Sequence, residues 1–197
     1  MITIWNWPKR RILLRTKSYV NDVYRVKFSP YVPGQLTSCG IAHIKFWKMA
    51  NTFTGLKLKG ELGRFGKTEF SDILGVLPMP DEKVVSGCDW GNILVWDGGL
   101  IKLEVFRTLR RKCHDGPIVQ ISFNQGELMT VAMDGHVKIW WYDKIDQADP
   151  PDDDRVIQIE PTYDFYTPGL MLMSLRKRYP DPKDTTYFGQ VLPSTSQ

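Results

Sequence analysis

Long hydrophobic runs are absent from this chain of 197 residues. No segment approaches the roughly 20 consecutive apolar residues of a transmembrane helix, so we expect no membrane partner. The N-terminal stretch MITIWNWPKRRILLR has no apolar core of signal-peptide length before its charges, and we do not expect secretion. The 3 cysteines are too few and too scattered for a disulfide framework, which indicates reduced thiols in the cytosol.

Histidine is also scarce, with 3 residues. A hydrolytic triad would combine one histidine, His114 or His136, with Asp134 and Ser122. No Gly-x-Ser-x-Gly nucleophile turn accompanies these residues. The cysteines and histidines also lack the close spacing of metal ligands. We therefore expect no enzymatic activity, catalytic residue, metal, cofactor or small-molecule substrate, and we interpret the cysteines as core residues, with Cys39 and Cys88 at the same repeat position.

Loops that bind phosphate or calcium are missing as well. The segment Gly60–Thr68 ends in Gly-Lys-Thr, but a P-loop needs its first glycine five positions before Gly66, where Glu61 stands. We predict a loop between repeats there. The acidic stretch Asp149–Arg155 lacks the glycine and final glutamate of an EF-hand loop, so we predict an exposed turn.

The charges are unevenly distributed, although 42% hydrophobic and 24% charged residues are ordinary for a globular protein. Residues 1–112 hold 19 basic and 9 acidic side chains, whereas residues 113–197 hold 7 basic and 13 acidic ones. This asymmetry fits a nucleic-acid face, two surfaces for different protein partners, or solubility alone. Phosphate binding needs several cations that converge on one face, whereas the basic runs at 9–11 and 107–112 fall on or just after predicted outer strands, where charge protects a sheet edge, so we expect no nucleic-acid partner.

Tryptophan is abundant, with 7 residues, and its spacing organises the sequence. Trp5, Trp47, Trp96 and Trp140 are separated by 42, 49 and 44 residues. The last three end similar segments, each with a small residue, a turn and a short apolar strand: Cys39–Trp47, Cys88–Trp96 and Ala132–Trp140. A period of about 40–45 residues with such an ending is typical of a β-propeller blade.

Further short strands surround each of these segments. Apolar and polar residues alternate in Val23–Ser29 and Ile118–Phe123, as in half-buried strands. We predict outer strands after the tryptophans, most clearly at Leu100–Phe106 and Val156–Glu160. The sequence thus predicts an all-β propeller segment with three full four-stranded blades and partial blades at both ends.

These units resemble WD40 repeats, and the third is the most similar. Its Cys113–Ile118 segment resembles the Gly-His entry of that family, Asp134-Gly135 its turn, and Trp140-Trp141 its Trp-Asp ending. The resemblance implies a buried hydrogen-bonded structural tetrad of His114, Asp134, Thr130 and Trp140. The second unit keeps Trp96-Asp97, and the first has Trp47-Lys48 without a Gly-His entry.

A narrower resemblance lies in residues 86–102, 146–150 and 159–161, which are similar to a family of large WD-repeat proteins of the ciliary axoneme. That resemblance implies a non-enzymatic scaffold of the cilium or flagellum. It would link the motor heads of an inner dynein arm to doublet microtubules and support movement, with dynein arm or tether components and tubulin as partners. The alternative is a generic cytosolic WD40 scaffold for protein interactions.

The repeat pattern also predicts how the chain is divided. We expect the end of a preceding blade at 1–16, blades at 20–62, 68–108 and 114–161, and the start of a further blade at 167–197. In that last part, Leu170–Leu175 and Tyr187–Val191 are its predicted strands. Because propellers close with roughly 4–8 blades, we expect the chain to be a fragment of a longer protein.

A basic run is the candidate contact with a protein partner. It consists of Arg107, Arg110, Arg111 and Lys112 and follows a predicted outer strand. Such charges commonly protect a sheet edge. In an axonemal scaffold they would instead contact an acidic surface, such as that of tubulin.

Overall fold

The computed structural model describes residues 1–150, 155–167, 173–176 and 190–193, and these are almost entirely β-structure. Its helical parts are a single turn of α-helix, α1 (Tyr142–Asp146), and a short 3₁₀ turn, Thr108–Arg110. In the described part of the chain, no helix is long and apolar enough to cross a membrane. The predicted all-β fold is confirmed.

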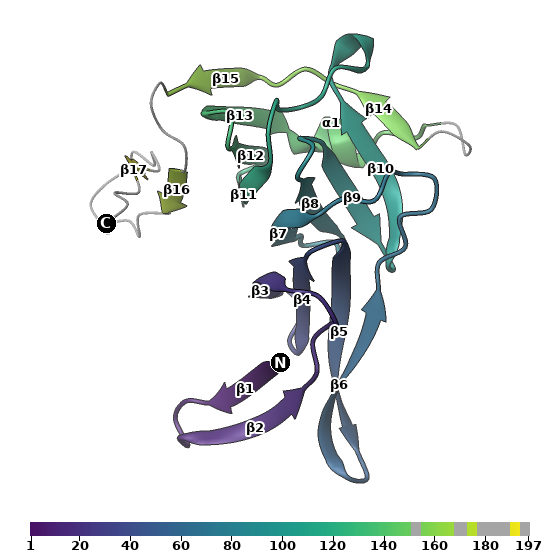
Figure 1. Cartoon of the computed structure of the whole chain (residues 1–197), viewed down its shortest axis with the longest axis vertical. Helices are drawn as coiled ribbons and strands as arrows, with labels where there is room; N and C mark the ends of the chain where they lie inside the picture. Colours follow the sequence, from purple (N-terminus) through teal and green to yellow (C-terminus); the bar gives the residue numbers. More distant parts are fainter. Residues whose placement is uncertain (151–154, 168–172, 177–189, 194–197) are drawn as a thin grey trace.

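Three antiparallel sheets follow one another along the chain, with a hairpin at each end (Figure 1). The first hairpin contains β1 (Ile2–Asn6) and β2 (Arg11–Thr16), and the first sheet contains β3 (Val23–Phe28), β4 (Gln35–Gly40), β5 (His43–Thr52) and β6 (Gly55–Leu62). The second sheet contains β7 (Ile73–Pro78), β8 (Val84–Cys88), β9 (Ile93–Asp97) and β10 (Leu100–Phe106). The third contains β11 (Ile118–Asn124), β12 (Glu127–Ala132), β13 (His136–Trp141) and β15 (Tyr163–Tyr166). Each of these antiparallel sets of four strands is a WD40-like blade.

The predicted outer strand at Val156–Glu160 is in the wrong place. The structure has β14 (Val156–Gln158), which pairs in parallel with β10 and therefore extends the second sheet. The fourth strand of the third sheet is β15, which pairs with β13. The apolar residues of this segment favour a strand but do not select its neighbour; Ile157 is buried in the core cluster beside β10. The repeat boundaries themselves remain predictions.

The final hairpin consists of β16 (Met173–Arg176) and β17 (Gln190–Pro193), which pair antiparallel. It overlaps the predicted strands Leu170–Leu175 and Tyr187–Val191. The other residues of those two predictions lie outside the described residues, as do residues 151–154 of the predicted acidic turn.

The cores lie between consecutive sheets. One cluster joins the β1–β2 hairpin to the first sheet around Trp47, and a second joins the first and second sheets around Trp96. A third joins the second and third sheets around Trp140. Because each sheet contributes to the clusters on both of its faces, the three tryptophans are almost completely removed from water. The exposed fractions of Trp47, Trp96 and Trp140 are 4%, 1% and 0%.

The β4–β5 turn, before the strand that carries Trp47, and the β8–β9 turn, before the strand that carries Trp96, differ in length. This difference changes the alignment of the repeats. In the first sheet Gly40 pairs with His43, whereas in the second the backbone N–H of Cys88 bonds to the Asn92 carbonyl. The first turn is therefore one residue shorter. Cys39 consequently aligns with Gly87, and its predicted equivalence to Cys88 is wrong.

The segment Gly60–Thr68 begins inside β6 and becomes a connection only after Leu62. The Phe65 ring is buried and meets the Trp96 ring edge-on, with 5.2 Å between the centroids. The predicted loop is thus shorter than expected and is anchored in the core between the first two sheets.

Candidate functional site

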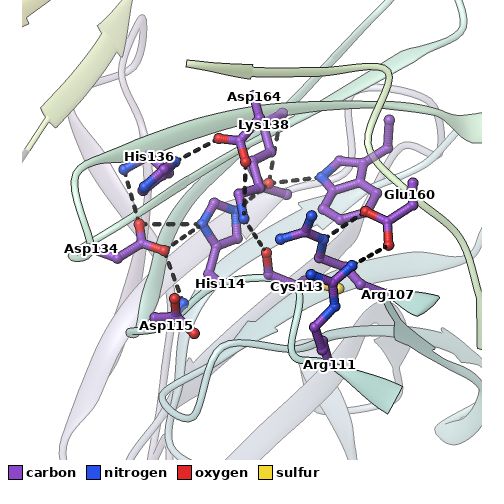
Figure 2. Close-up of polar contacts among 12 residues, drawn as sticks. Arg107, Arg111, Cys113, His114, Asp115, Asp134, His136, Lys138, Glu160 and Asp164 are labelled. Atoms are coloured by element: carbon purple, nitrogen blue, oxygen red, sulfur yellow. Dashed lines mark hydrogen bonds and ion pairs between the residues drawn. The ribbon is translucent and has the colours of Figure 1, made fainter. Parts of the chain in front are cut away.

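The third sheet contains a buried chain of hydrogen bonds (Figure 2). Trp140 on β13 donates from Nε1 to Thr130 Oγ1 on the neighbouring β12 over 2.9 Å. The same hydroxyl lies 2.8 Å from Nε2 of His114, which precedes β11. The other ring nitrogen of His114 lies 3.1 Å from Asp134 Oδ2 in the β12–β13 turn. The structure therefore brings the four residues of the predicted tetrad together.

The chemistry of these groups assigns the protons. An ionised carboxylate only accepts, so His114 Nδ1 carries the hydrogen that it donates to Asp134. Neutral Nε2 then accepts from the Thr130 hydroxyl, which in turn accepts from Trp140. Because each polar atom has a partner, burying the set carries no penalty for an unsatisfied group.

The local environment keeps His114 neutral and Asp134 ionised. Burial lowers the pKa of His114, although the nearby Asp134 carboxylate opposes this change. Burial alone would raise the pKa of Asp134. Hydrogen bonds from His114 and from the backbone N–H groups of His136 and Asp115 outweigh it and hold the pKa below its ordinary value. These bonds fix the turn and the strand that follows it.

The network extends to residues that the sequence reading missed. Lys138 is 4% exposed, and its Nζ donates to the Cys113 carbonyl over 2.8 Å and pairs with Asp164 Oδ2 over 3.4 Å. Asp164, on β15, also accepts from His136 Nδ1. The signal for Lys138 was a lysine two residues before the tryptophan, which recurs as Lys45 in the first unit. Asp164 gave no such signal because it lies on β15, a strand that the sequence analysis did not predict.

The other two sheets keep only half of this arrangement. Trp47 donates to Ser38 Oγ, and Trp96 donates to Ser86 Oγ, each over 2.8 Å. Near the second turn, Asn92 is fully buried and donates to Glu104 over 3.3 Å. The bond from tryptophan to a serine or threonine hydroxyl therefore recurs in all three sheets, and the histidine–aspartate half belongs to the third.

Neighbouring sheets are joined next to these turns. Asn92 Oδ1 accepts from the backbone N–H of Cys113 over 3.1 Å, and the Gly91 carbonyl accepts from the N–H of His114 over 2.9 Å. The Ala42 N–H donates to the Asp72 carboxylate over 2.9 Å, which joins the first sheet to the second. These bonds set the position of each sheet relative to the next.

The predicted partner-contact residues lie at the outer end of β10. Arg107 Nε and Arg111 Nη2 pair with the Glu160 carboxylate over 2.8 and 3.2 Å (Figure 2). Burial would raise the pKa of Glu160, but bonds from Thr108 and Arg107 lower it to about 2. Arg110 and Lys112 are exposed. Two of the four predicted contact residues, Arg107 and Arg111, are thus paired with Glu160.

The structure does not assemble the hypothetical triad. His114 is 0% exposed, and its Nε2 is occupied by Thr130, so it is not the base for Ser122 on β11. The three cysteines are also 0% exposed, and burial raises the pKa of Cys39 and Cys113 to about 12. What this arrangement can do chemically is hold strands and turns in a fixed geometry.

Comparisons with known proteins identify homologues of this chain. No family model matches the chain. It is 52% identical over 165 residues to mouse cilia- and flagella-associated protein 44, a match that covers 84% of this chain and 9% of that protein. The Chlamydomonas reinhardtii protein of the same name is 52% identical over 118 residues, which cover 60% of this chain and 7% of that protein. The chain is homologous to cilia- and flagella-associated protein 44.

More distant similarities agree with the fold. Echinoderm microtubule-associated protein-like 4 from Xenopus laevis is 28% identical over 155 residues, which cover 73% of this chain and 16% of that protein. The crystal structure of the computationally designed Ika8 protein matches 71% of this chain and 39% of its own, with a TM-score of 0.52 and 19% identity. That last similarity concerns the fold alone.

The homology supports a ciliary or flagellar role and location. The chain spans about a tenth or less of the length of the cilia- and flagella-associated relatives that it matches.

Proposed function

We propose that this chain is part of a non-enzymatic WD-repeat scaffold of the ciliary or flagellar axoneme. In this proposal the scaffold links the motor heads of an inner dynein arm to doublet microtubules and supports movement. The observation that carries it is the 52% identity, over 84% of the chain, to a protein named for its association with cilia and flagella. The partners are proteins of the dynein arm or tether, and tubulin.

The geometry supports a role in binding rather than in catalysis. We infer that the tetrad of His114, Asp134, Thr130 and Trp140 is structural, since its members are bonded to one another and shielded from solvent. A rigid array of sheets presents its loops and edges in fixed positions, which lowers the entropy lost when a partner binds. The basic run at Arg107–Lys112 is the proposed contact with an acidic surface.

The ciliary proposal is tested by fractionating ciliated cells and probing the fractions with an antibody raised against residues 84–160. We expect the signal in the salt-resistant axonemal pellet. A signal confined to the soluble cytosol would contradict the proposal and favour a generic cytosolic scaffold.

The contact proposal is tested by co-sedimentation with microtubules. Replacing Arg107, Arg110, Arg111 and Lys112 by alanine should weaken salt-sensitive binding, because the cations that attract an acidic surface are removed. The matched control replaces Lys9, Arg10, Arg11 and Arg15, an equal number of charges on the β1–β2 hairpin. Equal binding of both variants and the parent chain would eliminate this contact.

A further inference from the structure

The helix α1 occupies a specific place between two sheets. It follows β13 of the third sheet, and its Tyr142 and Ile145 are buried in the same cluster as Met79, which lies in the β7–β8 turn of the second sheet. The Tyr142 N–H donates to the Gly126 carbonyl in the β11–β12 turn over 2.9 Å. At the other end, Asp146 pairs with Lys83 in the β7–β8 turn. The helix therefore bridges the turns of two neighbouring sheets.

The equivalent place between the first and second sheets is an open groove of about 700 Å³. It is lined by the β3–β4 turn of the first sheet and the β7–β8 turn of the second. The strand register makes these positions equivalent, because Leu36, Val84 and Leu128 pair with the tryptophans of the three sheets. After Trp96 the chain enters β10 directly through Gly98 and Gly99, so the second sheet has no counterpart of α1.

The lining of the groove indicates what it would accept. Phe46 and Ala50, on the same face of β5 as Lys48, supply apolar surface, whereas the lining residues Trp47 and Met49 pack mainly against the β1–β2 hairpin and Trp96 is almost fully buried. On one wall, Lys48 and Lys59 are directly opposite each other on β5 and β6, and both are exposed. Like charges in such a cross-strand pair repel, so a carboxylate placed between them would be favourable. The facing wall carries Glu82 and Asp97, which disfavours a polyanion such as a nucleic acid.

We propose that this groove binds a short amphipathic segment of a protein partner, in the way that α1 occupies the neighbouring position. The segment has the chemistry of α1, with an aromatic and an aliphatic residue three positions apart that point into the groove. It adds a carboxylate directed at Lys48 and Lys59. A helical segment of five residues is about 7.5 Å long, and the groove has the size of a typical ligand pocket.

A synthetic helix tests the proposal directly. The probe is a fluorescein-labelled 14-residue peptide that carries Tyr-Asp-Lys-Ile-Asp, the α1 sequence, in an alanine–glutamate background. Fluorescence anisotropy against the full chain should show saturable binding. The Lys48→Glu, Lys59→Glu double variant should weaken binding by roughly tenfold or more, because attraction becomes repulsion. Ala50→Trp, which fills the groove, should weaken it without changing the charge.

The controls separate a groove from a charged surface. Lys57 lies on the same face of β6 but outside the groove, so Lys57→Glu should retain most of the binding. A peptide with serine in place of its tyrosine and isoleucine should not bind, and this control needs no protein variant. Absence of saturable binding to the parent chain would overturn the proposal, as would equal binding of the serine peptide or an equal loss in Lys57→Glu. Because the assay uses purified chain, its failure would leave the ciliary proposal intact.

Discussion

His114 Nε2 and Thr130 Oγ1 lie 2.8 Å apart in the interior of the third sheet, where neither residue is exposed to solvent. The Thr130 hydroxyl is also the acceptor for Trp140, so one oxygen atom joins the residue before β11 to the strands β12 and β13. Because this hydroxyl is buried and has two partners, removing it should lower the free energy of unfolding more than removing a surface hydroxyl.

Replacing this hydroxyl should destabilise the chain. Thr130→Val keeps the side-chain shape but leaves Trp140 Nε1 and His114 Nε2 without a partner. We expect the free energy of unfolding to fall by about 2–6 kcal/mol, since each of the two unsatisfied buried groups costs about 1–3 kcal/mol. Urea denaturation followed by tryptophan fluorescence measures the change. Thr130→Ser keeps the hydroxyl and should lose about 1 kcal/mol for the missing methyl group; an equal loss in both variants would mean that the hydrogen bonds contribute nothing.

Stability should also depend on pH below neutrality. Because burial lowers the pKa of His114 in the folded chain, the unfolded state binds a proton first as the pH falls. The stability contribution is therefore fully present above the ordinary histidine pKa of about 6.5 and is lost as the pH falls toward the folded pKa. We expect the free energy of unfolding to be smaller at pH 5.5 than at pH 7.5.

The variant His114→Gln isolates this effect. This variant should be less stable than the parent chain at pH 7.5. Its free energy of unfolding should, however, fall less between pH 7.5 and pH 5.5, and the difference in slope from the parent chain is at most about 1.4 kcal/mol per pH unit, the contribution of one proton. Urea denaturation at both pH values makes the comparison. An unchanged pH dependence would show that His114 is not the titrating group.

Gly91 should be intolerant of any side chain. Its φ of +99° is in the left-handed region, and a Cβ atom there would overlap the carbonyl oxygen of His114. Gly98 has a φ of +53° with open space around it, so Gly98→Ala is a matched control for backbone strain. We expect Gly98→Ala to cost about 1 kcal/mol and Gly91→Ala about 1–3 kcal/mol more, because overpacking is added to strain. Thermal and urea unfolding measure both, and equal losses would show that the second and third sheets tolerate a shift at this turn.

The cysteines should be unreactive in the native chain. Cys39, Cys88 and Cys113 are fully buried, and burial raises the pKa of each thiol, so the reactive thiolate is scarce. We expect no reaction with a thiol-specific dye at pH 7.5 within the time that denatured chain takes to react fully. The exposed Lys144→Cys variant supplies a positive control. Rapid labelling of the parent chain would mean that the sheets separate readily.

Much of this fold follows from local sequence. The tryptophan spacing and the alternating apolar residues determined the strands and their antiparallel order, because adjacent strands joined by short turns have few alternative pairings. The residues His114, Thr130, Asp134 and Trp140 were identified by a repeat resemblance, and the strand register explains why they meet. Thr130 and Trp140 occupy adjacent strands, and Asp134 lies in the turn between them.

Tertiary structure decided what sequence patterns leave open. Residues 156–158 have the apolar character of a strand, but only packing against β10 places them in the second sheet, which leaves β15 to complete the third. Asp164 consequently joins the buried network through a strand that periodicity did not reveal. The groove beside Lys48 and Lys59 likewise exists only because two sheets meet where the second has no helix. Local periodicity specifies which residues form strands, but which strands become neighbours depends on long-range packing and hydrogen bonding.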